Sequence, residues 1–233
     1  MREARIADSV LALHFRSVET ELYRLRFSDA ELKQARQFWR PICRYLQRYI
    51  PASGTTVDLG AGYCHFINTI ESREKIAVDV NEQALRKYAS GEVRPIVCSG
   101  ADLSEIASDS ADTVFASNVY EHFPSRPDVM RSFQEVRRIL KPGGRFIIMQ
   151  PNFAYCARSY FDFFDHVLVF TRAGMAEGLQ AAGFHIQVAR DRFLPYTSKR
   201  RLPKARWLVS AYLKTPLAWR FFGAQMLLVA ERP

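Results

Sequence analysis

The sequence feature that most constrains the fold is the stretch 56–64, Thr-Val-Asp-Leu-Gly-Ala-Gly-Tyr-Cys. An apolar run ends at Asp58, and Gly60 and Gly62 follow one residue apart. Glycine reaches backbone conformations that other residues avoid, so this pattern predicts a strand that runs into a tight turn and then into the start of a helix. Backbone N–H groups at a helix start point outward, and the turn therefore predicts a binding site for a small anionic or polar ligand.

Length and composition limit what surrounds this turn. A chain of 233 residues, 48% of them hydrophobic, can bury one full α/β core, so residues 1–233 are expected to form a single domain. No apolar run reaches the roughly 18 residues that a membrane span needs, and the N-terminus carries an acid and lacks the apolar block of a signal peptide. A cytoplasmic location is expected. The four cysteines form no C-x-x-C pair, so neither a disulfide framework nor a metal site is predicted.

The positive charge is concentrated towards the C-terminal end of the chain. Of the formal net charge of +9, seven charges come from residues 191–224, which hold eight basic residues and one acid, Asp191. This distribution predicts a local basic patch. The eight basic residues are Arg192, Lys199, Arg200, Arg201, Lys204, Arg206, Lys214 and Arg220.

Residues 1–50 are predicted to be an N-terminal helical segment. Apolar residues recur at helical spacing in 6–27, and Ser28 with Glu31 three positions later forms a capping-box pattern for the next helix. That helix is expected to be kinked at Pro41. Because the segment precedes the first strand, it is expected to pack over one end of the sheet.

From Thr55 onward, strand patterns alternate with helix patterns. This alternation predicts a mostly parallel sheet with right-handed crossovers and helices on both faces. The predicted sheet core is 55–190 with 225–233, and 191–224 is an insertion between its last two strands. Strands are predicted at 55–59, 75–79, 94–98, 112–117, 145–150, 184–190 and 225–231, helices at 129–140 and 172–182, a tight turn at 141–144 and a loop at 151–171.

Acidic residues follow the first three predicted strands. In an open α/β sheet, ligands bind beyond the carboxyl ends of the strands, at the switch point in strand order. Asp58 ends the first strand, and Asp79, 21 residues later, is placed to accept hydrogen bonds from ribose hydroxyls. Asp102 follows the third strand, where a carboxylate can accept from the exocyclic amine of a purine. Together the three acids predict an adenosine ligand.

The glycine turn separates two classes of adenosine cofactor. A dinucleotide site needs a third glycine at position 65, which is His65, and a turn free of acid beside the pyrophosphate. Asp58 precedes the turn and would repel a pyrophosphate, but its carboxylate can orient a cationic amino-acid group, directly or through water. The predicted ligand therefore carries positive charge together with a ribose and an adenine.

An ordered set of motifs spans residues 55–150. The motifs are Asp58-x-Gly60-x-Gly62, Asp79, Gly100-Ala101-Asp102-Leu103, Ser117-Asn118-Val119-Tyr120-Glu121-His122-Phe123 and Arg138-Ile139-Leu140-Lys141-Pro142-Gly143-Gly144. With this set the chain resembles the class I S-adenosylmethionine-dependent methyltransferases. The resemblance implies a Rossmann-like, seven-stranded, mostly parallel sheet with an antiparallel last strand. One departure is Cys64, which stands where the family usually has a third glycine.

The resemblance also implies a cofactor, S-adenosylmethionine, with S-adenosylhomocysteine as its product. Particular residues of the chain then take the cofactor-binding roles of the family. They are Asp58, Gly60, Ala61 and Gly62 for the methionine part, Asp79 and Val80 for the ribose, Ala101, Asp102 and Leu103 for the adenine, and Asn118 and Val119 for the edge near the sulfonium.

Two histidines are the candidate catalytic residues. Methyl transfer needs an acceptor held in line with the sulfonium, and a base when the acceptor is a hydroxyl. Histidine is the natural base near neutral pH, and His122 follows the fourth strand while His166 lies in the loop after the fifth. Similar enzymes often carry an E-H-F or E-H-L segment and a D-H-x-x-x-F-T segment at these two places. For both histidines a structural role stays open.

An aromatic wall is predicted beside these histidines. The candidate substrate-binding residues are Tyr155, Tyr160 and Phe164, in the loop after the fifth strand. Aromatic side chains suit an apolar or sugar-like acceptor. The alternative is that the loop packs these residues against the sheet.

The insertion 191–224 mixes basic and aromatic residues. A short helix at 204–213 would place Trp207, Leu208, Ala211 and Tyr212 on one face. This composition fits a lid over the acceptor, a homodimer contact, a peripheral contact with an anionic membrane, or, as the least favoured option, nucleic acid.

These observations predict a methyltransferase that modifies a small or lipid-linked molecule, for example a natural product, at oxygen in preference to nitrogen. Two alternatives stay open. One is an RNA methyltransferase. The other is a non-catalytic protein that keeps the fold and serves as an adenosine-ligand-binding or membrane-adaptor protein.

Overall fold

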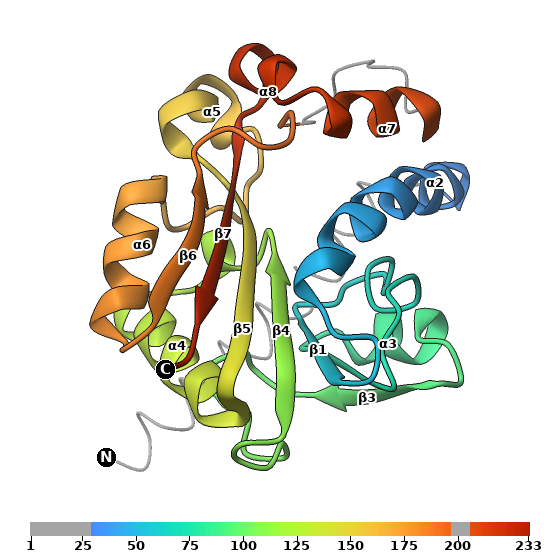
Figure 1. Ribbon diagram of the computed structural model, residues 1–233, viewed down its shortest axis with the longest axis vertical. Helices are drawn as coiled ribbons and strands as arrows, with labels where there is room; N and C mark the ends of the chain where they lie inside the picture. Colours follow the sequence, from blue (N-terminus) through green and yellow to red (C-terminus); the bar gives the residue numbers. More distant parts are fainter. Residues whose placement is uncertain (1–28, 197–205) are drawn as a thin grey trace.

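The computed structural model describes residues 29–196 and 206–233 (Figure 1). The helical pattern at 6–27 and the first residue of the capping box, Ser28, lie outside the described residues. So do Lys199, Arg200, Arg201 and Lys204 of the basic patch.

Seven strands form one sheet, and their bounds lie close to the predicted ones. The spatial order is β3-β2-β1-β4-β5-β7-β6. All neighbouring pairs are parallel except those of β7, which runs antiparallel to β5 and to β6. The Rossmann-like fold with an antiparallel last strand is therefore confirmed. The strands are β1 (Thr55–Leu59), β2 (Glu74–Asp79), β3 (Val93–Val97), β4 (Ala111–Ser117), β5 (Leu140–Pro151), β6 (His185–Arg190) and β7 (Gln225–Glu231).

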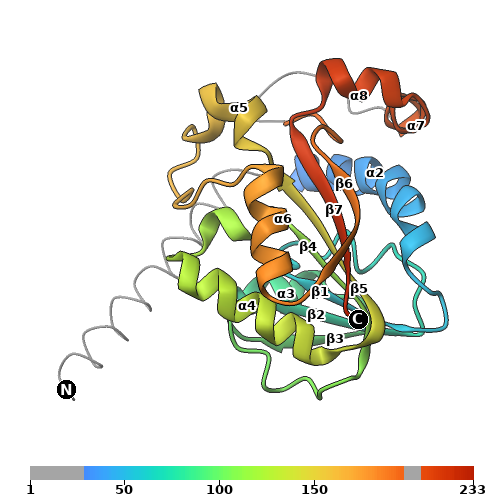
Figure 2. The same ribbon diagram turned by 60° about the vertical axis from the view of Figure 1, so that its left-hand side comes forward.

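Helices cover both faces of the sheet, as predicted. On one face, α4 (Arg126–Ile139) and α6 (Arg172–Ala181) pack their buried apolar residues against the strands. The other face is covered by α2 (Asp29–Leu46), α3 (Glu82–Tyr88) and the helices of the insertion. Figure 2 shows α4 and α6 in front of the sheet and α2 behind it.

The carboxyl end of the sheet has helices of its own. These are α5 (Phe153–Tyr160), which directly follows β5, and α7 (Arg206–Lys214) and α8 (Pro216–Phe222), which precede β7. They lie together above the strand ends (Figure 1). The N-terminal segment continues from α2 through the 3₁₀ turn η1 (Gln47–Tyr49) into β1, and α2 runs through Pro41.

Side-chain caps explain where several helices begin. Asn81, Ser125 and Thr171 precede α3, α4 and α6, and the side chain of each accepts a hydrogen bond from a backbone N–H in the first turn. Asn152 caps α5 in the same way, so the stretch 151–171, predicted as a loop, in fact contains a helix.

Two further predictions about local structure are wrong. The glycine turn is not followed by a regular helix, because Cys64 adopts a left-handed backbone conformation (φ 55°) and residues 61–70 form successive turns. The predicted tight turn at 141–144 is part of β5, which begins at Leu140 opposite Ala111 and is irregular up to the pairing of Thr113 with Arg145.

The short helix predicted at 204–213 in the insertion is observed as α7. The residues of α7 that are buried are Val209 and Leu213, whereas Trp207 on the predicted face is 72% exposed. The helix packs against α2 through the 209/213 side, so its orientation was decided by a segment far away in the sequence.

Candidate functional site

The glycine turn lies at the switch point of the sheet, where β1 has β2 on one side and β4 on the other. Gly60 has a φ of +71°, and a Cβ at this position would lie 2.3 Å from Cγ2 of Val119. Only glycine can therefore bring the end of β1 this close to the segment after β4. At Gly62 (φ +48°) a Cβ would meet no described atom within 4 Å, so the turn faces open space there.

Two carboxylates lie beside this turn. Asp79 accepts hydrogen bonds from the N–H groups of Gly62 (2.7 Å) and Asn81 (2.8 Å). Asp58 is buried, and burial together with the nearby charge of Asp79 raises its pKa to about 8, although a backbone hydrogen bond from Ile67 opposes the shift. A cation bound here would relieve the repulsion between the two acids. The residues therefore fit S-adenosylmethionine, which carries a cationic ammonium group and a sulfonium.

The predicted adenine segment is held mainly by α4. The Leu103 N–H donates to Oε2 of Glu135 (3.0 Å), and Arg138 donates to the Leu103 carbonyl (2.9 Å). The Ala101 N–H donates to the Ser99 hydroxyl (3.2 Å). The N–H groups of Ala101 and Leu103, which were predicted to contact the adenine, therefore already form hydrogen bonds within the chain.

Asp102 differs from its neighbours because its side chain is exposed. Its Oδ1 accepts from the Ser104 N–H (3.2 Å), and hydrogen bonds from Ser104 hold the pKa of the carboxyl below its usual range. The carboxylate can still meet an adenine at the surface. Sequence reasoning missed Glu135 and Arg138, which support this loop from a helix more than 30 residues away.

The predicted residues near the sulfonium come directly after β4. Asn118 is exposed, has a φ of 53°, and donates its N–H to the Met149 carbonyl (3.0 Å). Val119 is the residue that contacts Gly60. Asn118 and Val119 therefore link the glycine turn to the 3₁₀ turn η2 (Tyr120–His122), which carries the first candidate histidine.

The fold brings the two candidate histidines together. The rings of His122 and His166 are 5.1 Å apart. The carbonyl of Glu121 accepts from the N–H groups of Val167 (2.8 Å) and Leu168 (3.1 Å), and these two hydrogen bonds join the segment after β4 to the segment after α5. Asp79 lies within electrostatic range of His122, which places His122 on the cofactor side of this junction.

Each histidine has an acid beside it that sequence reasoning did not single out. Nδ1 of His122 lies 3.0 Å from the backbone oxygen of Asp165 and 3.4 Å from its Oδ2. Nε2 of His166 lies 4.0 Å from Oε1 of Glu121. Both acids are buried, and both directly precede a histidine in the sequence motifs, which is the signal that could have found them.

Glu121 is held from a neighbouring strand. Its Oε2 accepts a hydrogen bond from the side chain of Gln150 on β5, and burial raises the pKa of its carboxyl. Among the described residues, Glu121, His122 and His166 also form a group whose ligand atoms lie within 4.8 Å of one another, so they can hold a metal ion. The side chain of His122 is 19% exposed and that of His166 is 5% exposed, so His122 is the more accessible to an acceptor.

The three predicted substrate-binding residues lie in different surroundings. Tyr160 is buried, donates its hydroxyl to the Leu168 carbonyl, and packs its ring 4.6 Å from that of His166. Tyr155 is 43% exposed and Phe164 is 80% exposed. Tyr160 can therefore position His166, whereas Phe164 can meet a molecule from solution and Tyr155 lies under the guanidinium of Arg192. Their substrate roles stay predictions.

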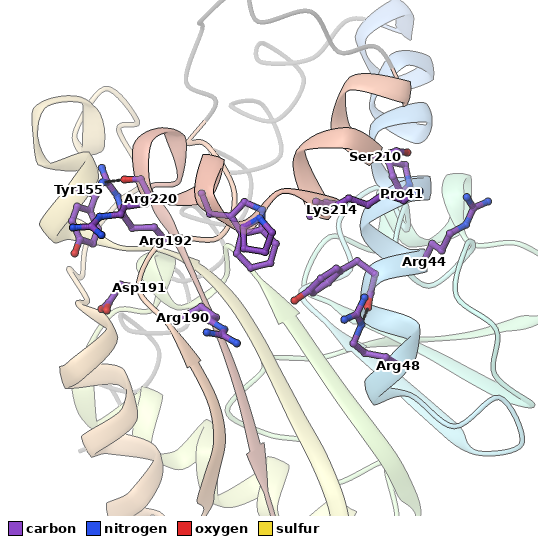
Figure 3. Close-up of a pocket in the computed structure, with 14 residues that line it drawn as sticks. Pro41, Arg44, Arg48, Tyr155, Arg190, Asp191, Arg192, Ser210, Lys214 and Arg220 are labelled. Atoms are coloured by element: carbon purple, nitrogen blue, oxygen red, sulfur yellow. Dashed lines mark hydrogen bonds between the residues drawn. The ribbon is translucent and has the colours of Figure 1, made fainter.

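A pocket of about 810 Å³ lies to one side of this site (Figure 3). It is bounded by α2, α5, α7, α8 and the end of β6, and none of the predicted cofactor residues lines it. The pocket is therefore separate from the glycine turn, although both lie towards the carboxyl end of the sheet. None of the described helices is long and apolar enough to cross a membrane.

The fold has many solved relatives. A SAM-dependent methyltransferase, possible histamine N-methyltransferase, from Thermotoga maritima has 16% identity and a TM-score of 0.65, covering 94% of this chain and 98% of that one. An S-adenosylmethionine-dependent methyltransferase from Mesorhizobium loti has 16% identity and a TM-score of 0.60, covering 84% and 98%. A chain from the complex of the Haloferax volcanii Trm112 methyltransferase activator with a methyltransferase has 20% identity and a TM-score of 0.62, covering 84% and 90%. These identities show the fold: a Rossmann-like methyltransferase fold.

A comparison of the sequence with protein-family models adds a second finding. Residues 57–148 match the family model of the methyltransferase domain. A search of curated proteins returned no match. With the strand order and the acids around the glycine turn, this match supports a class I S-adenosylmethionine-dependent methyltransferase and implies S-adenosylmethionine as the cofactor.

Proposed function

We propose that this enzyme methylates a hydroxyl group and that His122 is the base that removes the hydroxyl proton. The observation that carries the proposal is the 3.0 Å contact between Nδ1 of His122 and the backbone oxygen of Asp165. A backbone oxygen can only accept, so Nδ1 carries the ring proton and donates it. Nε2 is then left with its lone pair, as a general base requires.

The neighbouring acids support this role. As the acceptor proton moves to Nε2, the imidazole gains positive charge, and the Asp165 carboxylate 3.4 Å from Nδ1 stabilises that charge. Bound S-adenosylmethionine supplies an electrophilic methyl group. The chain's own contributions are to hold that cofactor at the glycine turn, to place the hydroxyl oxygen in line with the methyl group, and to take up the released proton.

The acceptor that we propose is a small or lipid-linked molecule with an apolar part. Support comes from the exposed aromatic residues Tyr155, Phe161 and Phe164, which lie on the same stretch as His166. Aromatic side chains that remain exposed on a folded protein mark surfaces that meet apolar partners. An amine acceptor would make less use of a histidine oriented for proton removal.

A second way to activate a hydroxyl is favoured by the arrangement of Glu121, His122 and His166. Two imidazoles and one carboxylate suit a divalent ion such as Zn²⁺ or Mn²⁺, and an ion there would lower the pKa of a bound hydroxyl. Dialysis against EDTA separates the two mechanisms. Turnover that survives EDTA supports His122 as base, whereas turnover that is lost and then restored by Mn²⁺ or Zn²⁺ supports the ion.

The experiment that tests the proposed function is transfer of a labelled methyl group. The purified protein is incubated with methyl-labelled S-adenosylmethionine and, separately, with a bacterial lipid extract, a mixture of phenols and total RNA. We expect label in phenols or lipids, and His122→Ala should lower that turnover about 10³-fold while S-adenosylhomocysteine binding is retained.

Other results of the same experiment would contradict the proposal. Label in RNA would favour an RNA methyltransferase. Cofactor binding without transfer to any fraction would favour a non-catalytic protein. Unchanged turnover of His122→Ala would remove His122 as the base, and His166→Ala would then be the next variant to measure.

A further inference from the structure

The pocket beside α2 is strongly basic. Six of the side chains that line it are cationic, and the only acid among its lining residues is Asp191. The cations come from three places in the sequence that the fold brings together: α2 with η1, the end of β6 and the insertion. They are Arg44, Arg48, Arg190, Arg192, Lys214 and Arg220.

The protein does not neutralise this charge itself within the part of the chain that the structure describes. The carboxylate of Asp191 is engaged with Arg172 (2.8 Å), which does not line the pocket. None of the six cations forms an ion pair with a described carboxylate. Like charges held together without counter-charges cost free energy, so an anion is expected to complete the site.

Two of the arginines are held in place before any ligand arrives. The guanidinium of Arg192 donates to the carbonyls of Gly223 and Arg220 and lies 4.3 Å above the ring of Tyr155. The guanidinium of Arg48 donates to the Tyr45 carbonyl and lies 4.0 Å from the Tyr45 ring. A guanidinium fixed in this way matches the oxygens of a phosphate and loses little freedom on binding.

The floor of the pocket is apolar. Leu213 and Trp219 are buried there, and the ring of Trp219 packs edge-on at 5.8 Å against that of Tyr45. Figure 3 shows Arg48, on η1 directly after α2, and Arg190, at the end of β6, on facing sides of the pocket. The site therefore offers cations to a charged group and an apolar surface to whatever carries that group.

Large apolar side chains stand exposed on the helices next to the pocket. Trp207 on α7 and Leu217, Phe221 and Phe222 on α8 are each between 66% and 72% exposed. Arg206, Lys214 and Arg220 are exposed on the same two helices. Aromatic and basic side chains on short surface helices are the composition of segments that lie in the headgroup region of a membrane.

We propose that this pocket binds the phosphate of an anionic lipid headgroup and holds the enzyme on a membrane surface. The cationic rim pairs with the phosphate, and the exposed residues of α7 and α8 enter the headgroup region. RNA fits the same residues less well, because single-stranded RNA needs a groove that follows several phosphates in succession. A single open pocket with an apolar floor fits one headgroup.

The test compares two double variants with the same change in net charge. Arg48→Glu/Arg190→Glu places acids on both sides of the pocket. Lys87→Glu/Arg94→Glu does the same on α3 and β3, at the opposite edge of the sheet. All four side chains are exposed, so both variants should fold, and equal stabilisation by S-adenosylhomocysteine in a thermal shift would show that the cofactor site is intact.

Binding is measured by co-sedimentation with vesicles of phosphatidylcholine alone and of phosphatidylcholine with phosphatidylglycerol. We expect the wild type to bind only the anionic vesicles. The pocket variant should bind them at least about 25-fold more weakly, because each basic residue at an anionic surface contributes about fivefold. The control variant should lose less than about fivefold.

Three results would overturn the proposal. Equal losses in both double variants would mean that net charge, and not the pocket, drives binding. Binding of inorganic phosphate or glycerol phosphate as tight as that of the vesicles would identify a site for soluble phosphate esters. RNA binding that is tighter than vesicle binding at physiological salt and is lost in the pocket variant would identify a nucleic-acid site. Because none of these results depends on methyl transfer, the proposal can fail without the proposed function failing.

Discussion

The carboxyl end of the sheet carries charge of opposite sign in two neighbouring regions. Around β1 and β2, Asp58 is buried and Asp79 is partly buried, and the carboxyl of Asp58 has a raised pKa. Around α2, β6 and α8, six cations stand largely exposed at the rim of a pocket. The first region selects a cation and the second an anion. The contrast also shows two ways of building a charged site. A few buried charges each interact strongly with a ligand, whereas exposed charges interact weakly one by one and bind a ligand only when several lie together.

Asp79→Ala is expected to produce the largest effect on the cofactor side. The variant removes an acceptor for the ribose and frees the Gly62 N–H, which Asp79 holds at 2.7 Å. Hydrogen bonds to a charged group contribute about 1.5–3 kcal/mol each, so affinity for S-adenosylhomocysteine should fall about 100-fold or more. Isothermal titration calorimetry measures the change.

Asp102→Ala is the matched control for this comparison. Asp102 is exposed and hydrogen bonded to Ser104, so its removal should weaken S-adenosylhomocysteine by about fivefold or less. If the two variants lose affinity equally, burial is not what distinguishes the two acids, and the assignment of Asp79 to the ribose would need to change.

The second prediction concerns pH and the buried Asp58. In the free protein its pKa is about 8, so below that pH the carboxyl is mostly protonated. The ammonium group of the ligand favours the ionised form, and binding must then release a proton. Affinity for S-adenosylhomocysteine should therefore rise about 50-fold between pH 6 and pH 8 and level off above about pH 9.

Calorimetry in buffers of different ionisation enthalpy measures that proton directly. We expect nearly one proton to be released per ligand bound at pH 7. Asp58→Asn should abolish both the release and the pH dependence, with its affinity close to that of the wild type at pH 6 and below it at pH 8. Affinity that falls as the pH rises from 6 to 8 would contradict a cation at Asp58.

The smallest expected effect belongs to the exposed region. Phe221→Ala/Phe222→Ala removes two rings that are each about two-thirds exposed, so the stability of the protein should change little. Binding to anionic vesicles should fall about fivefold to tenfold, because the lost apolar area no longer enters the headgroup region. Val97→Ala, which shortens an exposed apolar side chain on β3 at the far edge of the sheet, is the control. An equal loss of vesicle binding in both variants would contradict the proposal that α8 forms the membrane contact.

Local sequence determined the cofactor half of the molecule. The predicted strands lie within a few residues of the observed ones, and Asp58, Gly60 and Gly62 lie at the switch point, because glycine spacing and alternating patterns act over a few residues. The exception is the expected helix after the turn. There Cys64 adopts a positive φ that only its packed surroundings maintain.

Only the tertiary structure decided the acceptor side. Glu121 and Asp165 became partners of the two histidines because two loops about 40 residues apart are joined by backbone hydrogen bonds to one carbonyl. The basic pocket likewise draws Arg48, Arg190 and Arg220 from opposite ends of the chain. The buried side of α7 was decided in the same way, by its packing on α2. The sequence by itself determined which residues could bind a cationic adenosine cofactor, through local backbone geometry, whereas long-range packing determined which charges meet elsewhere.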